Sequence, residues 1–351
     1  MNALRRLFLL FSLVALASCG GGGGGGTVPN STAIIGVALD SYVNPTKLYV
    51  TNADNQTVQV VDIATNAVTT LAGLANTAGT ADGTGSVARF YEPFGIALSG
   101  SDLFVADTNN HTIRKLTTAG VVSTLAGTAG TYGSVDGTGP AANFKTPKSL
   151  VGDGGTNLYV ADSFNHTIRK VVISTGVVST IAGYGGTTGT ADGAGSAAKF
   201  NEPFGITYDA TGTNLYVTDT VNQLIRQVTP GGVVTTWAGT VSTTGTTDAT
   251  GTAAKFNFPA GIVNDGTNLY VADSENHVIR KIVIASKVVT TLAGTAGTAG
   301  AADGSGAAAR FNRPIGLTID SVGNLYVVDQ NYTKIRKVTS AGVVTTLTAT
   351  F

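Results

Sequence analysis

Charge and cysteine are both scarce in this chain of 351 residues. Only 12% of the residues are charged, and 21 Lys and Arg balance 21 Asp and Glu. A nucleic-acid-binding patch needs clustered Lys and Arg, and a disordered tail needs a high net charge, so both classes are excluded. A single cysteine excludes an intramolecular disulfide framework and a cysteine-rich zinc site. What remains is an apolar chain that contains 47 glycines.

The start of the chain has the pattern of a secretion signal. Arg5 and Arg6 precede an apolar run over residues 7–17. This run is too short to span a bilayer as a helix, which takes about 20 residues. A basic start, an apolar middle and small residues at the end are typical of a signal peptide. The sequence therefore predicts a signal peptide over residues 1–18.

Residues 16–19, Leu-Ala-Ser-Cys, resemble the lipobox of bacterial lipoproteins, in which the cysteine is acylated and becomes the new N-terminus. The resemblance implies a covalent lipid on Cys19 that anchors the chain in the membrane of the bacterial cell envelope. In that family an Asp after the cysteine retains the protein in the inner membrane. Gly20 stands there, so the resemblance implies the outer membrane.

The segment 19–33 contains seven consecutive glycines, which behave as a flexible tether between the lipid and the folded part. Removal of residues 1–18 leaves 19 basic and 21 acidic residues, a formal net charge of −2. No basic patch supports membrane binding, so the anchoring is expected to come from the acyl chains alone.

One five-residue sequence motif recurs through the rest of the chain. It reads Leu-Phe-Val-Ala-Asp at residues 103–107, and its Asp recurs at spacings of 55, 57, 54 and 56 residues. A degenerate copy, Leu-Tyr-Val-Thr-Asn, lies 55 residues upstream and ends at Asn52. Six copies of one structural unit therefore fill residues 34–351.

Each copy contains four apolar runs of four to six residues, rich in Val, Ile, Leu, Thr and Tyr and separated by Gly, Asp, Asn and Ser. These are strand signatures without a helical period. Four antiparallel strands per repeat favour an all-β, six-bladed β-propeller over a β-helix. The expected blades cover about 34–73, 93–127, 147–183, 203–239, 259–294 and 314–351. No strand is evidently shared between the first and last blades, so closure of the ring is left to packing or to residues 27–33.

The motif Asp-x-x-Asn-His-x-Ile-Arg at residues 107–114, 162–169 and 273–280 resembles the NHL repeat. The resemblance covers residues 34–351 and implies the propeller fold, but little about function, because NHL propellers include protein-binding and RNA-binding modules and a zinc-dependent lyase class. The residues interpreted as structural in this motif are Asp107, His111, Arg114, Asp162, His166, Arg169, Asp219, Arg226, Asp273, His277, Arg280, Asp329 and Arg336.

Five long loops of about 20 residues join consecutive blades. We call the side of the propeller that carries them the loop-rich face. Each loop repeats an Asp and a Phe, and most carry a basic residue before the Phe. Four loops place a Gly-x-Gly turn after the Asp, and the fourth reads Asp-Ala-Thr-Gly at residues 248–251. The structural interpretation is that the Phe packs between blades while the Asp and the basic residue orient the loop. The functional interpretation is a charged ring at the pore mouth, with candidate binding residues Asp82, Arg89, Asp136, Asp192, Lys199, Asp248, Lys255, Asp303 and Arg310.

The three histidines, His111, His166 and His277, suggest a zinc site, since zinc often has three histidine ligands. They occupy equivalent turns of different blades, on the order of 10 Å or more apart. Because zinc holds each nitrogen at roughly 2.0–2.1 Å, these side chains do not share one ion. The loops also lack the acid density of a calcium site and the Lys of a phosphate-binding loop. We predict no cofactor other than the lipid.

Catalysis on a repeat needs unlike groups that depart from the common pattern. The departures are Tyr132, Lys145, Lys148, Tyr184, Trp237, Glu275 and Tyr332, and they contain no catalytic triad and no pair of carboxylates within one copy. The sequence therefore favours a non-enzymatic binding or scaffold module that meets a protein or glycan partner on its loop-rich face. The alternative is a metal-dependent lyase or lactonase, and RNA binding is disfavoured by the net charge and the predicted export. Neither the partner nor the oligomeric state follows from the sequence.

Overall fold

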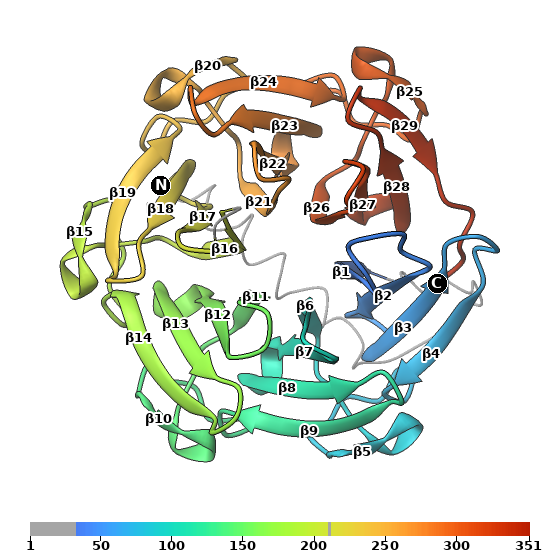
Figure 1. Cartoon of the computed structure of the whole chain (residues 1–351), viewed down its shortest axis with the longest axis vertical. Helices are drawn as coiled ribbons and strands as arrows, with labels where there is room; N and C mark the ends of the chain where they lie inside the picture. Colours follow the sequence, from blue (N-terminus) through green and yellow to red (C-terminus); the bar gives the residue numbers. More distant parts are fainter. Residues whose placement is uncertain (1–32, 210–211) are drawn as a thin grey trace, which may run out of the picture. The chain divides into compact units, whose positions relative to one another are not determined.

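Each repeat folds into one antiparallel sheet, and the six sheets are arranged radially around a central axis (Figure 1). This is a computed structural model, and it describes residues 33–209 and 212–351. The predicted signal peptide, Cys19 and residues 20–32 lie outside the described residues. The expectation of an all-β, six-bladed propeller is confirmed.

Every blade has four main strands that follow one another from the axis to the rim. The innermost strands are β1 (Ile34–Leu39), β6 (Pro93–Ser99), β11 (Pro147–Gly152), β16 (Pro203–Tyr208), β21 (Pro259–Asn264) and β26 (Pro314–Ile319). The second strands are β2 (Lys47–Asn52), β7 (Asp102–Asp107), β12 (Asn157–Asp162), β17 (Leu215–Asp219), β22 (Asn268–Asp273) and β27 (Leu325–Asp329). The third strands are β3 (Thr57–Asp62), β8 (Thr112–Thr117), β13 (Thr167–Val172), β18 (Leu224–Val228), β23 (Val278–Val283) and β28 (Lys334–Val338). The fourth strands are β4 (Val68–Ala72), β9 (Val121–Ala126), β14 (Val177–Gly183), β19 (Val233–Ala238), β24 (Val288–Ala293) and β29 (Val343–Thr346).

Blades 2 to 6 contain a short fifth strand that the repeat pattern does not predict. The long loop before each of these blades first adds two residues to the outer edge of that blade and then returns to the axis. These strands are β5 (Gly83–Thr84), β10 (Gly137–Thr138), β15 (Gly193–Ala194), β20 (Ala249–Thr250) and β25 (Gly304–Ser305). In these five blades the added strand pairs with two residues of the fourth strand and covers part of its hydrogen-bonding edge.

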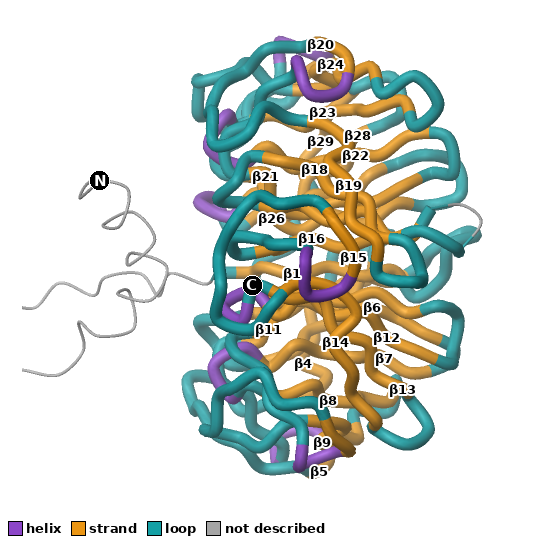
Figure 2. Tube along the Cα trace, turned by 90° about the vertical axis from the view of Figure 1, so that its left-hand side faces the viewer, coloured by secondary structure: helices purple, strands orange, loops and turns teal. Residues whose placement is uncertain are grey.

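Short 3₁₀ turns complete the loops. One set directly follows the fifth strands and comprises η2 (Gly85–Val87), η4 (Gly139–Ala141), η6 (Gly195–Ala197), η7 (Gly251–Ala253) and η9 (Gly306–Ala308). A second set links the second and third strands and comprises η3 (Thr108–Asn110), η5 (Ser163–Asn165), η8 (Ser274–Asn276) and η10 (Gln330–Tyr332). In Figure 2 the 3₁₀ turns gather toward one side of the ring, which is the loop-rich face.

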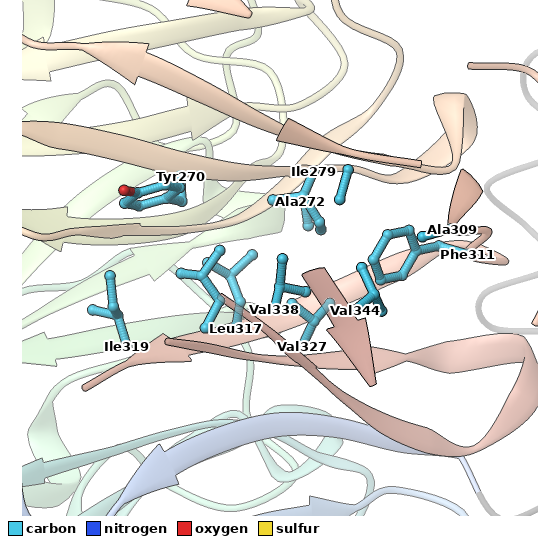
Figure 3. Packing of buried hydrophobic residues seen from close by; sticks show 12 residues of the cluster. Tyr270, Ala272, Ile279, Ala309, Phe311, Leu317, Ile319, Val327, Val338 and Val344 are labelled. Carbon is cyan, nitrogen blue, oxygen red and sulfur yellow. The ribbon is translucent and has the colours of Figure 1, made fainter. Parts of the chain in front are cut away.

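The hydrophobic core consists of seams between neighbouring blades. Figure 3 shows the seam between blades 5 and 6, where Tyr270 and Ile279 of one blade meet Leu317 and Val344 of the next. Phe311, which comes from the loop between these blades, is fully buried in the same cluster. The equivalent loop phenylalanines Phe90, Phe144, Phe200 and Phe256 are likewise fully buried. Each long loop thus inserts one aromatic ring into the seam that it crosses.

Glycine near the start of the innermost strand lets neighbouring blades approach closely around the axis. A Cβ on Gly95 would lie 2.6 Å from the carbonyl oxygen of Lys148 in the next blade. A Cβ on Gly316 of blade 6 would lie 2.1 Å from the carbonyl oxygen of Ile35 in blade 1. Blades 6 and 1 therefore close the ring by the same backbone packing, without a shared strand among the described residues.

Candidate functional site

A buried arginine ties each long loop to its blade. In blade 2, Nη1 of Arg114 donates to Oδ2 of Asp107 at 2.6 Å, and Nη2 donates to Oδ1 of Asp82 in the loop at 2.7 Å. Nη1 also donates to the backbone carbonyl of Arg89 at 2.9 Å. The guanidinium carbon lies 5.3 Å from the centre of the Phe90 ring. One side chain therefore holds the second strand, the loop and the aromatic ring of the seam together.

The two carboxylates of this network have different environments. Although partial burial alone would raise the pKa of Asp82, the Thr124 amide and the Arg114 guanidinium bring that pKa below its usual value. Burial raises the pKa of Asp107 to about 6, and the charge of Arg114 opposes this rise. Asp107 also accepts hydrogen bonds from the Asn110 side chain at 2.8 Å and the Tyr91 amide at 2.8 Å.

The same network recurs in blades 3 to 6. Its loop Asp, Arg and strand Asp are Asp136, Arg169 and Asp162; Asp192, Arg226 and Asp219; Asp248, Arg280 and Asp273; and Asp303, Arg336 and Asp329. Each loop Asp also accepts hydrogen bonds from a Thr of the fourth strand, such as Thr180 beside Asp136. The structure therefore places these candidate acids at the outer strands of their blades, where each is bound within its own blade.

The candidate basic residues of the loops are also engaged within the loops. Nη1 of Arg89 donates to the carbonyl of Ala88 at 2.8 Å, and Nζ of Lys199 donates to the carbonyl of Ser196 at 2.8 Å. The backbone carbonyls of four of these residues accept from the buried arginines: Arg89, Lys199, Lys255 and Arg310. The geometry shows how these residues orient the loop.

The histidines connect neighbouring blades. Nδ1 of His111 accepts a hydrogen bond from the backbone amide of Thr146, at the start of the next blade, at 3.2 Å. His166 and His277 accept equivalent bonds from the amides of Glu202 and Arg313. Burial lowers the pKa of His166 to about 4, which keeps its imidazole in the neutral form that can accept. In blades 1 and 4 the side-chain oxygens of Gln56 and Gln223 accept the corresponding amide.

A cavity of about 300 Å³ lies along the propeller axis and is lined by the innermost strands. We call it the axial cavity. Its lining includes Ile96, Leu150, Ile262 and Leu317, and Lys148 is the only charged residue in that lining. Ligand pockets are commonly apolar concavities with a few placed polar groups, so the axial cavity is the candidate site.

Lys148 is the second residue of β11, close to the loop-rich end of its strand. The equivalent positions in the other blades are apolar: Ile35, Phe94, Phe204, Ala260 and Ile315. Nζ of Lys148 lies 3.4 Å from the centre of the Phe94 ring, a cation–π contact. Phe94 in turn packs edge to face against Phe204, with ring centres 6.4 Å apart.

The negative charges of two glutamates, in the loops that lead into the two neighbouring blades, affect the pKa of Lys148. Burial lowers the pKa of Lys148 to about 8, and the charges of Glu92 and Glu202 oppose this fall. Burial also raises the pKa of Glu202 to about 7, against the charge of Lys148. Glu92 and Glu202 directly precede the first proline of blades 2 and 4. Groups that titrate close to neutral pH are common at functional sites.

The described residues contain no group of three or more His, Cys, Asp or Glu side chains with the geometry to hold a metal ion. Within residues 33–209 and 212–351, no helix has the length and apolar character needed to cross a membrane.

No family model matches this chain. It is 29% identical over 279 residues to NHL repeat-containing protein 2 of Homo sapiens, covering 70% of this chain and 38% of that protein. It is 31% identical over 273 residues to Protein SUPPRESSOR OF QUENCHING 1, chloroplastic, of Arabidopsis thaliana, covering 73% of this chain and 26% of that protein. The chain thus spans less than half of the length of these curated relatives.

Solved structures share the architecture at low sequence identity. An auxiliary nutrient binding protein from Bacteroides thetaiotaomicron aligns with a TM-score of 0.64 and 16% identity, over 90% of this chain and 69% of that chain. A gluconolactonase from Xanthomonas campestris aligns with a TM-score of 0.57 and 12% identity, over 86% of this chain and 84% of that chain. Such identities show the fold alone. The homologues of this chain are therefore NHL repeat-containing proteins, and its own fold is the six-bladed β-propeller that the repeat motif predicts.

Proposed function

We propose that this chain is a lipid-anchored, non-enzymatic binding module of the cell envelope, whose ligand enters the axial cavity from the loop-rich face. The observation that carries the proposal is Lys148, a partly buried cation present in one blade of six, at a position that is apolar in the other five. The fold does not require a charge at this position, because the apolar residues Ala260 and Ile315 are buried at the equivalent positions of blades 5 and 6. Its position beside Phe94 supports a binding role.

The rest of the molecule supports this assignment. The loop acids and arginines are engaged inside their own blades, whereas Lys148, a departure from the repeat, lines the axial cavity. Its volume of about 300 Å³ lies at the lower end of the range for small-molecule pockets. The fold likeness to an auxiliary nutrient binding protein is consistent with a binding module.

The test is a thermal-shift screen of the purified full-length protein against organic acids, amines, sugars, glycans and peptides. A ligand that occupies the native state raises the melting temperature by mass action. We expect at least one class to stabilise the wild type but not Ala97→Trp, which fills the axial cavity. The matched control is Ala75→Trp on an exposed loop, which should respond like the wild type. Ligands that stabilise Ala97→Trp equally well, or no stabilising ligand at all, would contradict the proposal.

The lipid anchor is tested separately. We expect the wild type to incorporate labelled palmitate and to fractionate with the outer membrane, whereas Cys19→Ala should do neither. Gly20→Asp should keep the lipid and move to the inner membrane, as the lipoprotein resemblance implies. A Cys19→Ala protein that still carries label would refute the assignment of the acylated residue.

A metal-dependent lyase or lactonase is the second candidate, and the fold likeness to a gluconolactonase is the observation that favours it. Plasma mass spectrometry of protein purified without chelator and dialysed after exposure to zinc and calcium distinguishes the two. One tightly held ion per chain would favour this candidate over the binding module.

A further inference from the structure

The axial cavity combines an apolar wall with a single charge. Its lining comes from all six innermost strands and is dominated by aliphatic side chains and backbone. Within β6 it extends from Phe94 to Leu98, which corresponds to about 13 Å along a strand. A ligand that fills this space is therefore elongated and largely apolar. The only charged side chain that it would meet in the lining is Lys148.

Lys148 has no ion-pair partner within residues 33–209 and 212–351. Its pKa of about 8 keeps the ammonium group protonated at neutral pH. Glu92 and Glu202 act on it through their charges, but neither forms an ion pair with its Nζ among the described residues. Charged groups removed from water are normally paired, so an unpaired ammonium beside an apolar cavity is a site for an anion.

We propose that the ligand is an organic monocarboxylate with an apolar body, held by an ion pair between its carboxylate and Nζ of Lys148. This inference rests on the proposed binding function of the axial cavity. A cationic ligand would be repelled by Lys148. A phosphate or dicarboxylate would bring a second negative charge toward Glu92 and Glu202, with no second cation in the cavity lining to offset it. One carboxylate matches the single cation of the cavity lining.

The titrating groups around Lys148 predict how this binding depends on pH. Deprotonation of Lys148 above about pH 8 removes the ion pair, so affinity should fall as the pH rises through that value. Protonation of Glu202 below about pH 7 removes a negative charge near the bound carboxylate, so affinity should rise toward about pH 6. Burial also raises the pKa of Glu92, on the opposite side of Lys148, and its protonation acts in the same direction.

The test uses three probes with the same aliphatic chain and different head groups: octanoate, octanamide and octylamine. Binding to the purified full-length protein is measured by isothermal titration calorimetry at about pH 6 and again above the pKa of Lys148. The variants are Lys148→Met, which keeps the length of the side chain without the charge, and Lys148→Arg, which keeps the charge. The control is Lys115→Met, which removes a half-buried lysine of β8 that pairs with Asp102 of β7.

We expect octanoate to bind the wild type at least tenfold more tightly than octanamide, and octylamine to bind more weakly still. Lys148→Met should abolish the preference for octanoate, Lys148→Arg should retain it at alkaline pH, and Lys115→Met should leave it unchanged. Octanoate binding that is equal in wild type and Lys148→Met, or absent at millimolar concentration, would overturn the carboxylate assignment. A neutral or cationic ligand that Ala97→Trp excludes would overturn it while leaving the binding function intact.

Discussion

The buried arginine of the repeat gives the sharpest prediction of stability. Arg169 is fully buried, and its two Nη atoms each donate to one carboxylate and one loop carbonyl. Arg169→Gln removes the charge and leaves Asp162, which is also fully buried, without its cation. Breaking a buried ion pair by removing one partner costs about 3–5 kcal/mol, because the remaining charge is uncompensated.

Blade 1 supplies the matched double variant. At the equivalent positions it has Asn52 and Gln59, and Nδ2 of Asn52 donates to Oε1 of Gln59 at 3.2 Å. Asp162→Asn combined with Arg169→Gln recreates this neutral pair in blade 3. The double variant loses hydrogen bonds to the loop but leaves no buried charge, so we expect a loss of about 2 kcal/mol.

Urea unfolding measures both losses as changes in the free energy of unfolding. The single tryptophan, Trp237, provides the fluorescence signal, since it packs edge to face on Tyr216 in the neighbouring blade 4. The double variant should be more stable than Arg169→Gln alone. The reasoning is refuted if Arg169→Gln costs less than about 1 kcal/mol, or if adding Asp162→Asn lowers the stability further.

Three further substitutions test the packing between blades, each by its effect on thermal and urea unfolding. His111→Gln should be tolerated, because Gln accepts the corresponding amide hydrogen bond in two other blades. His111→Ala leaves the Thr146 amide without its acceptor and should lower the free energy of unfolding by about 1–2 kcal/mol. Equal effects of the two substitutions would contradict this role of His111. Gly261→Ala should cost about 1–3 kcal/mol, because its Cβ would lie 2.3 Å from the carbonyl oxygen of Ile315, and a neutral outcome would show that the ring can widen there. Phe256→Ala should cost about 3–5 kcal/mol through the cavity left in its seam, and a smaller loss would mean that the long loop collapses to fill it.

The sequence predicts the blades because each repeat must bury its strands against its neighbours. A second strand such as β22 is therefore buried along its whole length, whereas β9 at the rim buries Val122 and Ala126 and exposes Val121 and Ser123. The fifth strands could not be predicted in this way. Each has two residues, and it forms because the loop Asp bonds to the fourth strand, a contact between residues more than 40 positions apart.

The candidate site was only partly visible in the sequence. Lys148 stands out as a departure from the repeat, but the pattern does not show that it lines the axial cavity. The pairing of β11 with β12 shifts register between Pro147 and Ser149, and the other innermost strands have similar irregularities. A register shift breaks the alternation of side chains that places residues on one face or the other. Periodicity therefore fails at the position on which the proposed binding function rests.

The exception in blade 1 shows that the buried ions and the long loop form one unit. A guanidinium has five donors, and in blades 2 to 6 four of them are used by two carboxylates and two loop carbonyls. Residues 20–32, which precede blade 1, contain no acid that could replace Asp82. An arginine in that blade would lose the loop carboxylate. The amide of Gln59 has two donors and no charge, so it can be buried beside Asn52 at lower cost. Blade 1 therefore lacks the strand Asp, the Arg and the loop Asp together, because burying the first two as ions without the loop carboxylate would cost free energy.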